Sequence, residues 1–172
     1  MSLLRLGFCA SLALAGVLAL PGCDGSDGTT GPTFVTELAI QDAAGMSKQD
    51  FARGETVFLV MTVRNRSNQT IEVQPPASCA DHEFMVAPMR SSDPLWRASF
   101  GIFCILQVQS ITFAPLETKT FRGQWNQVDN SQQPVPAGSY EIFGTLADNF
   151  FPGQQGSKPS QLSSTLKLIN IN

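Results

Sequence analysis

The chain has 172 residues and a formal net charge of −3, with 42% hydrophobic and 15% charged residues. This length suits one domain once targeting segments are removed. A weakly acidic chain lacks the basic footprint that phosphate recognition requires, which excludes nucleic acid as a partner. After the N-terminal apolar run, no stretch is long and apolar enough to span a bilayer.

The N-terminus has the pattern of an export signal. Arg5 is followed by 15 apolar or small residues, Leu6 to Leu20. A helix of that length is about 22 Å long, whereas the hydrocarbon core of a bilayer is about 30 Å thick, so the run is short for a span. We therefore predict a signal peptide over residues 1–22. The alternative is an N-terminal anchor that is never cleaved.

The run ends in Leu20-Pro21-Gly22-Cys23, which resembles the bacterial lipobox. The resemblance implies that the Cys23 thiol becomes a thioether to diacylglycerol and that Cys23 is the first mature residue. Two or three acyl chains hold a protein stably in a bilayer, whereas one chain holds it marginally. The alternative is secretion after a cut near Ala19, without lipid. Loss of Arg5 with the signal peptide brings the net charge to −4.

Residues 23–32 are predicted to be a lipidated cysteine and a flexible tether. From Asp24 to Pro32 the sequence is rich in glycine and has no apolar side chain to bury. The folded domain is therefore predicted over residues 33–172. A chain of that length buries about 68–70% of its unfolded surface, which is enough for a core of its own.

The domain is predicted to be all-β. Apolar residues recur at every second position in short segments separated by proline- and glycine-rich turns, which is typical of a sandwich or barrel. The strand at Val57–Val63 has apolar residues on both faces and is predicted to be central. Ala43–Phe51 is predicted to be a loop. The predicted strands contain Phe34, Thr36, Leu38 and Ile40; Val57, Leu59, Met61 and Val63; Ile71 and Val73; Phe84 and Val86; Leu95–Ser99; Phe103–Phe113; Thr118–Trp125; Tyr140, Ile142, Gly144 and Leu146; and Leu162, Leu166, Leu168 and Ile171.

Six aromatic side chains are predicted to lie in the core rather than on a ligand platform, because sandwiches bury aromatic residues between their sheets. This group consists of Trp96, Phe100, Phe103, Phe121, Trp125 and Tyr140.

Two cysteines remain after Cys9 is lost with the signal peptide and Cys23 takes lipid. Cys79 and Cys104 are predicted to form one disulfide outside the cytoplasm. It would close a loop of about 25 residues and stabilise the fold by roughly 3 kcal/mol. The alternative is a metal site that adds His82, but such a site lacks a fourth ligand close in sequence. We expect no metal and no cofactor.

His82 is the only histidine, in Asp81-His82-Glu83. On a strand, Asp81 and Glu83 would point to the face opposite His82 and could not orient its ring. No Gly-x-Ser-x-Gly segment supports a Ser-His-Asp triad. The sequence therefore predicts no catalytic residue, and His82 is predicted to be a half-exposed strand residue.

A polar loop bracketed by prolines runs from Pro88 to Pro94 and contains Met89, Arg90 and Ser91. A substrate-like loop that prolines hold rigid loses little conformational entropy when it enters a protease cleft. Met89, Arg90 and Ser91 are therefore candidate protease contacts. The alternative is an ordinary hairpin connection.

Five segments, in order, resemble the BsuPI-type intracellular proteinase inhibitor domain. The resemblance implies an immunoglobulin-like antiparallel β-sandwich that inhibits a serine protease. This chain departs from the family pattern with Cys79 in place of glycine, His82 in place of tyrosine and Ala98 in place of a second tryptophan, and Cys104 follows the family's phenylalanine. The matching segments are Val57–Asn65 with Ser67; Ser78–Val86, against Ser-Gly-Gln-x-Tyr-Asp-Phe-x-Val; Leu95–Ser99 with Phe103, against Val-Trp-Arg-Trp-Ser…Phe; Pro115 and Glu117 before Phe121 and Trp125, against Pro-Gly-Glu…Phe…Trp; and Pro136–Tyr140, against Pro-x-Gly-x-Tyr.

These observations lead to one functional hypothesis with two alternatives. The chain is expected to be a lipid-anchored, non-enzymatic binding module of the cell envelope, on its periplasmic or extracellular face, with BsuPI-type inhibition as its narrower form. Its expected partners are the membrane, through the lipid on Cys23, and a serine protease or another envelope protein. The first alternative is a structural or assembly lipoprotein without a protease target. The second is a hydrolase that gathers His82 with distant groups.

Overall fold

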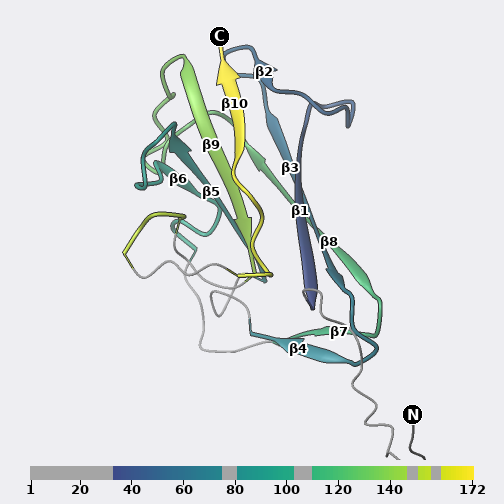
Figure 1. The fold of residues 1–172 in the computed structure, drawn as a ribbon. Coiled ribbons are helices and arrows are strands. Elements are labelled where there is room, and N and C mark those ends of the chain that lie inside the picture. Colours follow the sequence, from purple (N-terminus) through teal and green to yellow (C-terminus); the bar gives the residue numbers. More distant parts are fainter. Residues whose placement is uncertain (1–32, 75–80, 103–109, 147–150, 156–159) are drawn as a thin grey trace, which may run out of the picture.

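The computed structural model describes residues 33–74, 81–102, 110–146, 151–155 and 160–172, and these residues form ten strands and no helix. The strands alternate in chain order with loops, and Figure 1 shows them as two facing layers with a small pair across one end. They are β1 Phe34–Gln41, β2 Asp50–Phe51, β3 Val57–Asn65, β4 Ile71–Val73, β5 Glu83–Pro88, β6 Trp96–Arg97, β7 Ile111–Phe113, β8 Thr118–Trp125, β9 Gly138–Thr145 and β10 Lys167–Ile171.

The two layers have the strand arrangement of an immunoglobulin-like sandwich. One sheet has the order β1-β3-β8, and the other has the order β2-β10-β9-β5-β6. Strands β1, β3 and β8 take the places of immunoglobulin strands A, B and E, while β5, β9 and β10 take those of C, F and G. All pairings are antiparallel except the short β2–β10 pairing, which is parallel. The predicted fold class is confirmed, and β3 is central as expected.

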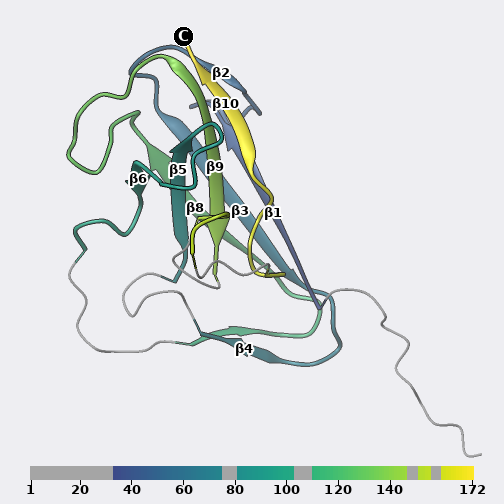
Figure 2. The same cartoon turned by 60° about the vertical axis from the view of Figure 1, so that its left-hand side comes forward.

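A third, two-stranded sheet pairs β4 with β7 and lies across the end of the sandwich where β1 begins (Figure 2). The predicted strand containing Ile71 and Val73 is present as β4, in which Ile71 is paired with Phe113 and Val73 with Ile111. This pairing is non-local, which explains why the spacing along the chain did not reveal it.

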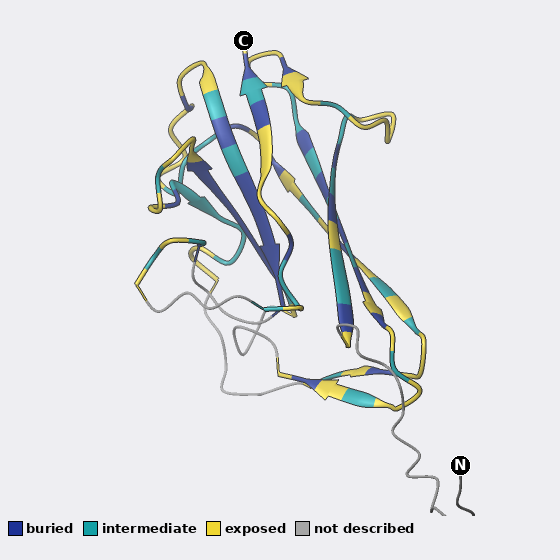
Figure 3. Cartoon of the chain, in the orientation of Figure 1, coloured by how far each residue is buried: buried dark blue, intermediate teal, exposed yellow. Residues whose placement is uncertain are grey.

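The core lies between the two sheets (Figure 3). Of the aromatic residues predicted to be in it, Phe121, Trp125 and Tyr140 are buried and Trp96 is half-buried, but the prediction is wrong for Phe100, which is 60% exposed in the chain after β6. On β3, four alternate side chains are fully buried, and on β9 the same is true of Ile142. Phe121 and Trp125 on β8 face inward, while Thr118, Thr120 and Arg122 face outward. The β3 residues are Val57, Leu59, Met61 and Val63.

Phe84 of β5 is tightly surrounded, both by the facing sheet and by the neighbouring strand β9. A Cβ atom on Gly123 of β8 would lie 2.7 Å from Cδ2 of Phe84, and one on Gly144 of β9 would lie 2.9 Å from Sδ of Met61 and 3.0 Å from Cε1 of Phe84. Glycine is therefore required at both positions, because any side chain would displace a fully buried aromatic ring. Phe84 thus locks β5 against the facing sheet.

Two predicted segments differ in the structure. The Ala43–Phe51 segment, predicted to be a loop, contains β2, where Phe51 is fully buried. The last strand begins only at Lys167, and its inward side chains are Ile169 and Ile171. Leu166 and Leu168 are 40% and 45% exposed. Four apolar residues within six positions do not fix the phase of an alternating strand, and the pairing with β9 decides it.

Several predictions lie outside the described residues. They are the signal peptide over residues 1–22, the lipidation of Cys23, the tether, the proposed Cys79–Cys104 disulfide and most of the Phe103–Phe113 strand. Within the described parts of the chain, no helix is long and apolar enough to cross a membrane.

Candidate functional site

The loop after β5 is the predicted protease contact, and it forms a tight turn. The Ser91 N–H donates to the Pro88 carbonyl (2.9 Å), and Arg90 has a φ of 67° at the third position of the turn. Such a left-handed conformation is normally left to glycine. The Met89 N–H donates to the Ser139 carbonyl (2.9 Å), and the Arg90 N–H to Oε2 of Glu141 (3.2 Å). The turn is therefore tied to β9 on both sides of its tip.

The side chains at this tip are available to a partner. Met89 is 42% exposed, and Arg90 is also exposed. Ser91 is half-buried, and its Oγ accepts a hydrogen bond from the N–H of Asp93 (3.1 Å). The backbone is a turn rather than the extended strand of a protease substrate, so a protease would meet the side chains of Met89 and Arg90 rather than a substrate-like main chain. A role for these residues stays a prediction.

Tyr140 fixes the neighbouring loop. Its hydroxyl donates to the Pro136 carbonyl at 2.6 Å. A tyrosine near the start of strand F that bonds to the backbone a few residues upstream is the tyrosine corner of immunoglobulin-like folds. Burial raises the pKa of the Tyr140 hydroxyl, and the positive charge of Arg53 partly opposes this. The Pro136–Tyr140 motif therefore has a structural role. Its hydrogen bond fixes the loop before β9, which lies beside the Met89–Ser91 turn.

Gln127 is a buried polar residue that the sequence reading missed. It has a φ of 57°, and its Nε2 donates to the carbonyls of Ala52 (2.7 Å) and Glu55 (2.9 Å), while its Oε1 accepts from the N–H of Gly54 (2.9 Å). One side chain therefore ties the segment after β8 to the β2–β3 connection. Its partners lie more than 70 residues away, so no local pattern could identify them.

His82 is partly exposed, as predicted, but it lies outside the strand and its ring is oriented differently from the prediction. Its Nδ1 lies 2.5 Å from Oδ1 of Asp81, so the neighbouring carboxylate does orient the ring. The expectation failed because alternation applies within a strand, whereas β5 begins only at Glu83. The imidazole also packs edge-on against Phe84 (ring centroids 5.0 Å apart) and at a tilt against Phe121 (5.3 Å). His82 therefore covers the edge of the core.

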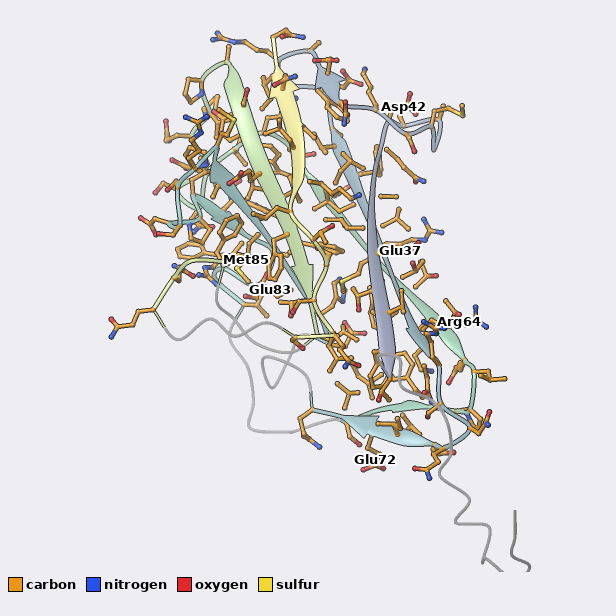
Figure 4. The ribbon with its side chains drawn as sticks, viewed as in Figure 1. Glu37, Asp42, Arg64, Glu72, Glu83 and Met85 are labelled. Atoms are coloured by element: carbon orange, nitrogen blue, oxygen red, sulfur yellow. The ribbon has the colours of Figure 1, made fainter. Side chains whose placement is uncertain are left out.

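Glu83 is the most deeply buried charged residue among those described, at 1% exposure. Its Oε1 accepts from the N–H groups of Phe84 (3.0 Å) and Ser99 (3.2 Å), and its Oε2 accepts from the Ser99 hydroxyl. Figure 4 shows it on β5 close to Met85. The two bonds from Ser99 tie the chain after β6 to β5. Glu83 thus acts as a structural clamp in the described fold.

Among the described residues, no group of three or more histidine, cysteine, aspartate or glutamate side chains gathers in a way that could hold a metal ion. Asp81 pairs with His82, and the Ser99 hydroxyl is bonded to Glu83. The proposed Cys79–His82–Cys104 metal alternative involves two cysteines outside the described residues.

At the end of the sandwich opposite the Met89–Ser91 turn, Asn65 organises the chain between β3 and β4. Its Nδ2 donates to the carbonyls of Gln69 (2.8 Å) and Ala114 (3.0 Å), and its Oδ1 accepts from the N–H (2.9 Å) and the hydroxyl (2.8 Å) of Ser67. Asn65 is fully buried and uses both ends of its amide. Asn65 and Ser67, which end the first motif segment, therefore stabilise the turn that follows β3.

The strand order and the tyrosine corner define an immunoglobulin-like β-sandwich domain. The family model described as BsuPI, intracellular proteinase inhibitor, matches residues 45–149. The match covers more than half of the chain and includes all five motif segments. The chain belongs to the BsuPI family.

The solved structures that match have low identities. They include a β-glucosidase from Listeria innocua in complex with isofagomine (10% identity, TM-score 0.43, covering 80% of this chain and 16% of that one) and the β-glucosidase EmGH1 from Erythrobacter marinus (13%, 0.45, 81% and 15%). Another is the CARDB domain of PF1109 from Pyrococcus furiosus (10%, 0.38, 80% and 94%). The chain spans about one sixth of the length of these glucosidases. Glucosidase activity does not transfer to this chain at such similarity. No curated protein gives a significant match.

Proposed function

We propose that this protein is a lipid-anchored, non-enzymatic inhibitor of a serine protease at the cell envelope. The observation that carries the proposal is the BsuPI family match over residues 45–149, because the family is described as a proteinase inhibitor. The sandwich and its clamped loops are consistent with a binding module, since rigid scaffolds that present exposed loops commonly carry binding functions.

The proposed location comes from the N-terminal sequence. The lipobox-like Leu20–Cys23 segment and the preceding apolar run support export and lipidation of Cys23. An exported inhibitor would meet proteases of the envelope or the surrounding medium, so its target would differ from that of an intracellular family member.

The proposed contact is the Met89–Ser91 turn. Its side chains project at one end of the sandwich, and its main chain is fixed to Ser139 and Glu141, so little conformational entropy remains to be lost on binding. Arg90 would suit a protease that prefers a basic side chain, since an acidic pocket would pair with its guanidinium.

The test uses the chain without residues 1–22 and with Cys23→Ser, which retains the whole described sandwich. Its effect on subtilisin-like and trypsin-like proteases is measured as residual activity at increasing inhibitor concentration. Saturable loss of activity with the chain left intact supports inhibition. Full protease activity at all concentrations, or cleavage after Arg90, overturns it. In that case, a stable partner recovered from membranes without added protease would support an assembly role instead.

The anchoring half of the proposal has a separate test. The full chain is expressed in a bacterium and followed by cell fractionation and intact mass. The membrane fraction should hold a form heavier than the unmodified chain from Cys23 by its acyl groups. Cys23→Ser should move the protein out of that fraction. Equal membrane association of both forms would overturn lipidation as the anchor.

A further inference from the structure

Three segments meet at the end of the sandwich where the described chain begins. The Arg66 N–H donates to the Thr33 carbonyl at 2.7 Å, and the Leu116 N–H donates to the Ser67 carbonyl at 3.2 Å. We call this region, made of Thr33, Arg64, Arg66 and Leu116, the Thr33 end. It is the end at which β1 starts and β4 and β7 lie (Figure 1).

The Thr33 end carries two exposed arginines beside a hollow. Arg64 and Arg66 line a depression of about 380 Å³ on the outer face of the β1-β3-β8 sheet, together with Val35 and the hydroxyl-bearing side chains of Thr62 and Thr118. Neither arginine forms an ion pair with any described residue. Guanidinium groups and hydroxyls are the donors that bind phosphate oxygens well.

Acidic groups near the hollow limit its charge without cancelling it. Glu37 also lines the hollow, and Figure 4 shows it on the same sheet, farther than Arg64 from the end where Glu72 lies. Glu117 is occupied by Lys119, with Nζ and Oε1 2.9 Å apart. The hollow itself therefore has two positive side chains against one negative one, on a mature chain whose expected net charge is −4.

Leu116 gives the same end an apolar tip. Its side chain is 53% exposed, and its φ is 59° at the third position of the turn that Glu117 closes onto Ala114 (3.2 Å). Left-handed backbone is costly for leucine, and glycine would adopt it freely. A strained, exposed leucine at the same end of the sandwich as two exposed arginines is the combination that suits the boundary between lipid headgroups and acyl chains.

The position of the anchor makes a membrane the nearest surface. Only the ten residues from Cys23 to Pro32 separate the proposed lipid from Thr33, so Thr33 lies within about 35 Å of the bilayer even if they are fully extended. We propose that the Thr33 end rests on anionic phospholipid, with Arg64 and Arg66 on headgroup phosphates and Leu116 in the interface. The orientation that this gives a lipidated chain rests on the proposed lipid anchor.

The Met89–Ser91 turn lies at the end of the sandwich far from Thr33. It follows the end of β5, where Pro88 is paired with Tyr140 near the start of β9 (Figure 1). Docking by the Thr33 end would therefore hold the proposed protease contact away from the bilayer, where a protease can approach it.

The experiment measures vesicle binding without the lipid anchor. The Cys23→Ser chain from residue 23 onward is mixed with sedimenting vesicles of phosphatidylcholine and phosphatidylglycerol, or of phosphatidylcholine alone. Binding is expected to the anionic vesicles only, and to be lost at about 1 M salt, where the screening length falls to about 3 Å. No binding to anionic vesicles at low salt, or equal binding to both, overturns the proposal.

Matched variants assign the surface. Arg64→Gln with Arg66→Gln should weaken binding roughly 10- to 30-fold, since each basic residue contributes roughly three- to fivefold at an anionic surface. Glu37→Gln should strengthen it, and Arg53→Gln, at the Tyr140 end, should leave it unchanged. Leu116→Gly should weaken binding while the fold keeps or gains stability. An Arg53→Gln effect as large as that of the arginine pair would overturn the assignment.

Failure here and failure of the lipid anchor give different results. If Cys23 is lipidated but the unlipidated chain ignores anionic vesicles, the surface assignment is wrong and the anchor stands. If the unlipidated chain binds as described but Cys23 carries no lipid, the surface stands and the anchor is wrong.

Discussion

Arg90 and Leu116 occupy the same position in two similar turns at opposite ends of the sandwich. Each is the third residue of a four-residue turn closed by a main-chain hydrogen bond, with φ of 67° and 59°. Each is exposed and carries a long side chain where glycine would be free of strain. Strain that persists at an exposed position is a reason to look for a function of the side chain.

Arg90→Gly separates stability from function at the first turn. Removing the left-handed strain is offset partly by the greater freedom of glycine in the unfolded chain, so the free energy of unfolding should stay the same or rise by up to about 1 kcal/mol. Protease inhibition should fall at least about tenfold if Arg90 is the main contact. Urea unfolding and residual protease activity measure the two effects.

Leu116→Gly is the matched control, because it makes the same backbone change at the other end. It should leave inhibition unchanged. Should Arg90→Gly inhibit as well as the unchanged protein, the Met89–Ser91 turn would not be the main protease contact.

Gly123→Ala tests the close approach of the two sheets. The added methyl group would lie 2.7 Å from the ring of Phe84, which is fully buried. Overpacking of this kind costs about 1–3 kcal/mol of unfolding free energy. Chemical denaturation measures it, and Gln124→Ala, at the exposed neighbouring position, should change little.

A second substitution checks the cause. Phe84→Leu costs stability alone, but it removes the ring atoms that the new methyl group would meet. The two substitutions together should therefore cost less than the sum of their separate effects. Strict additivity would mean that the ring of Phe84 is not what excludes a side chain at position 123.

The sequence predicted the sheets better than their connections, for physical reasons. Rows such as Val57–Val63 in β3 and Tyr140–Ile142 in β9 were found because every second residue in them is apolar and faces the core. The short β2 strand contains two residues, too few to show alternation, and Phe51 is buried by its tertiary position. In β10 the apolar residues occupy both faces, so only the pairing with β9 shows that Ile169 is inside.

The polar contacts that fix the loops were the least predictable. Three buried polar side chains form hydrogen bonds to groups in other segments of the chain: Asn65, Glu83 and Gln127. For Gln127, the partner Ala52 is 75 positions away in the sequence. The family motifs contain Asn65 and Glu83, but give no partner for them. The family motif Pro-Gly-Glu has a glycine at the position of Leu116. The positive φ at this position is one that glycine adopts without strain, which accounts for the glycine in the motif.

Tyr140→Phe tests the corner beside the proposed contact. The substitution removes the 2.6 Å hydrogen bond to the Pro136 carbonyl but keeps the ring and its edge-on contact with Trp125 (ring centroids 5.5 Å apart). The loss should be about 1 kcal/mol, since Pro136 is exposed and water can replace the donor. Equilibrium unfolding in urea measures it, and unchanged stability would contradict a structural role for this bond.

Alkaline titration reads the same residue directly. Tyr140 is the only tyrosine in the chain, so the absorbance of its phenolate reports one group. Burial raises the pKa of the Tyr140 hydroxyl above 10 in the folded protein. The stability associated with this shift is complete below pH 10 and is lost as the pH rises through the folded pKa, because the unfolded chain ionises first. A folded-state midpoint at or below that of the unfolded chain would contradict the burial.

Acid should weaken two turns that are built alike. Glu55 accepts from the Ala52 N–H (2.9 Å) and pairs with Lys48, and Glu117 accepts from the Ala114 N–H (2.7 Å) and pairs with Lys119. The lysine hydrogen bond, and then the backbone N–H, lower the pKa of each carboxyl below its ordinary value of 4.5. Both groups therefore add stability that is present above pH 4.5 and declines as the pH falls through the lowered pKa values.

The measurement is the free energy of unfolding in urea at a series of pH values from neutral to about 3. Glu55→Gln with Glu117→Gln should be less stable than the unchanged chain at neutral pH and should lose less stability on acidification, because an amide does not titrate. Glu72→Gln is the control, since Glu72 is an exposed glutamate on β4 without an ion pair among the described residues. Parallel acid profiles for the double variant and the unchanged chain would show that these two carboxylates do not stabilise the fold through their ionised forms.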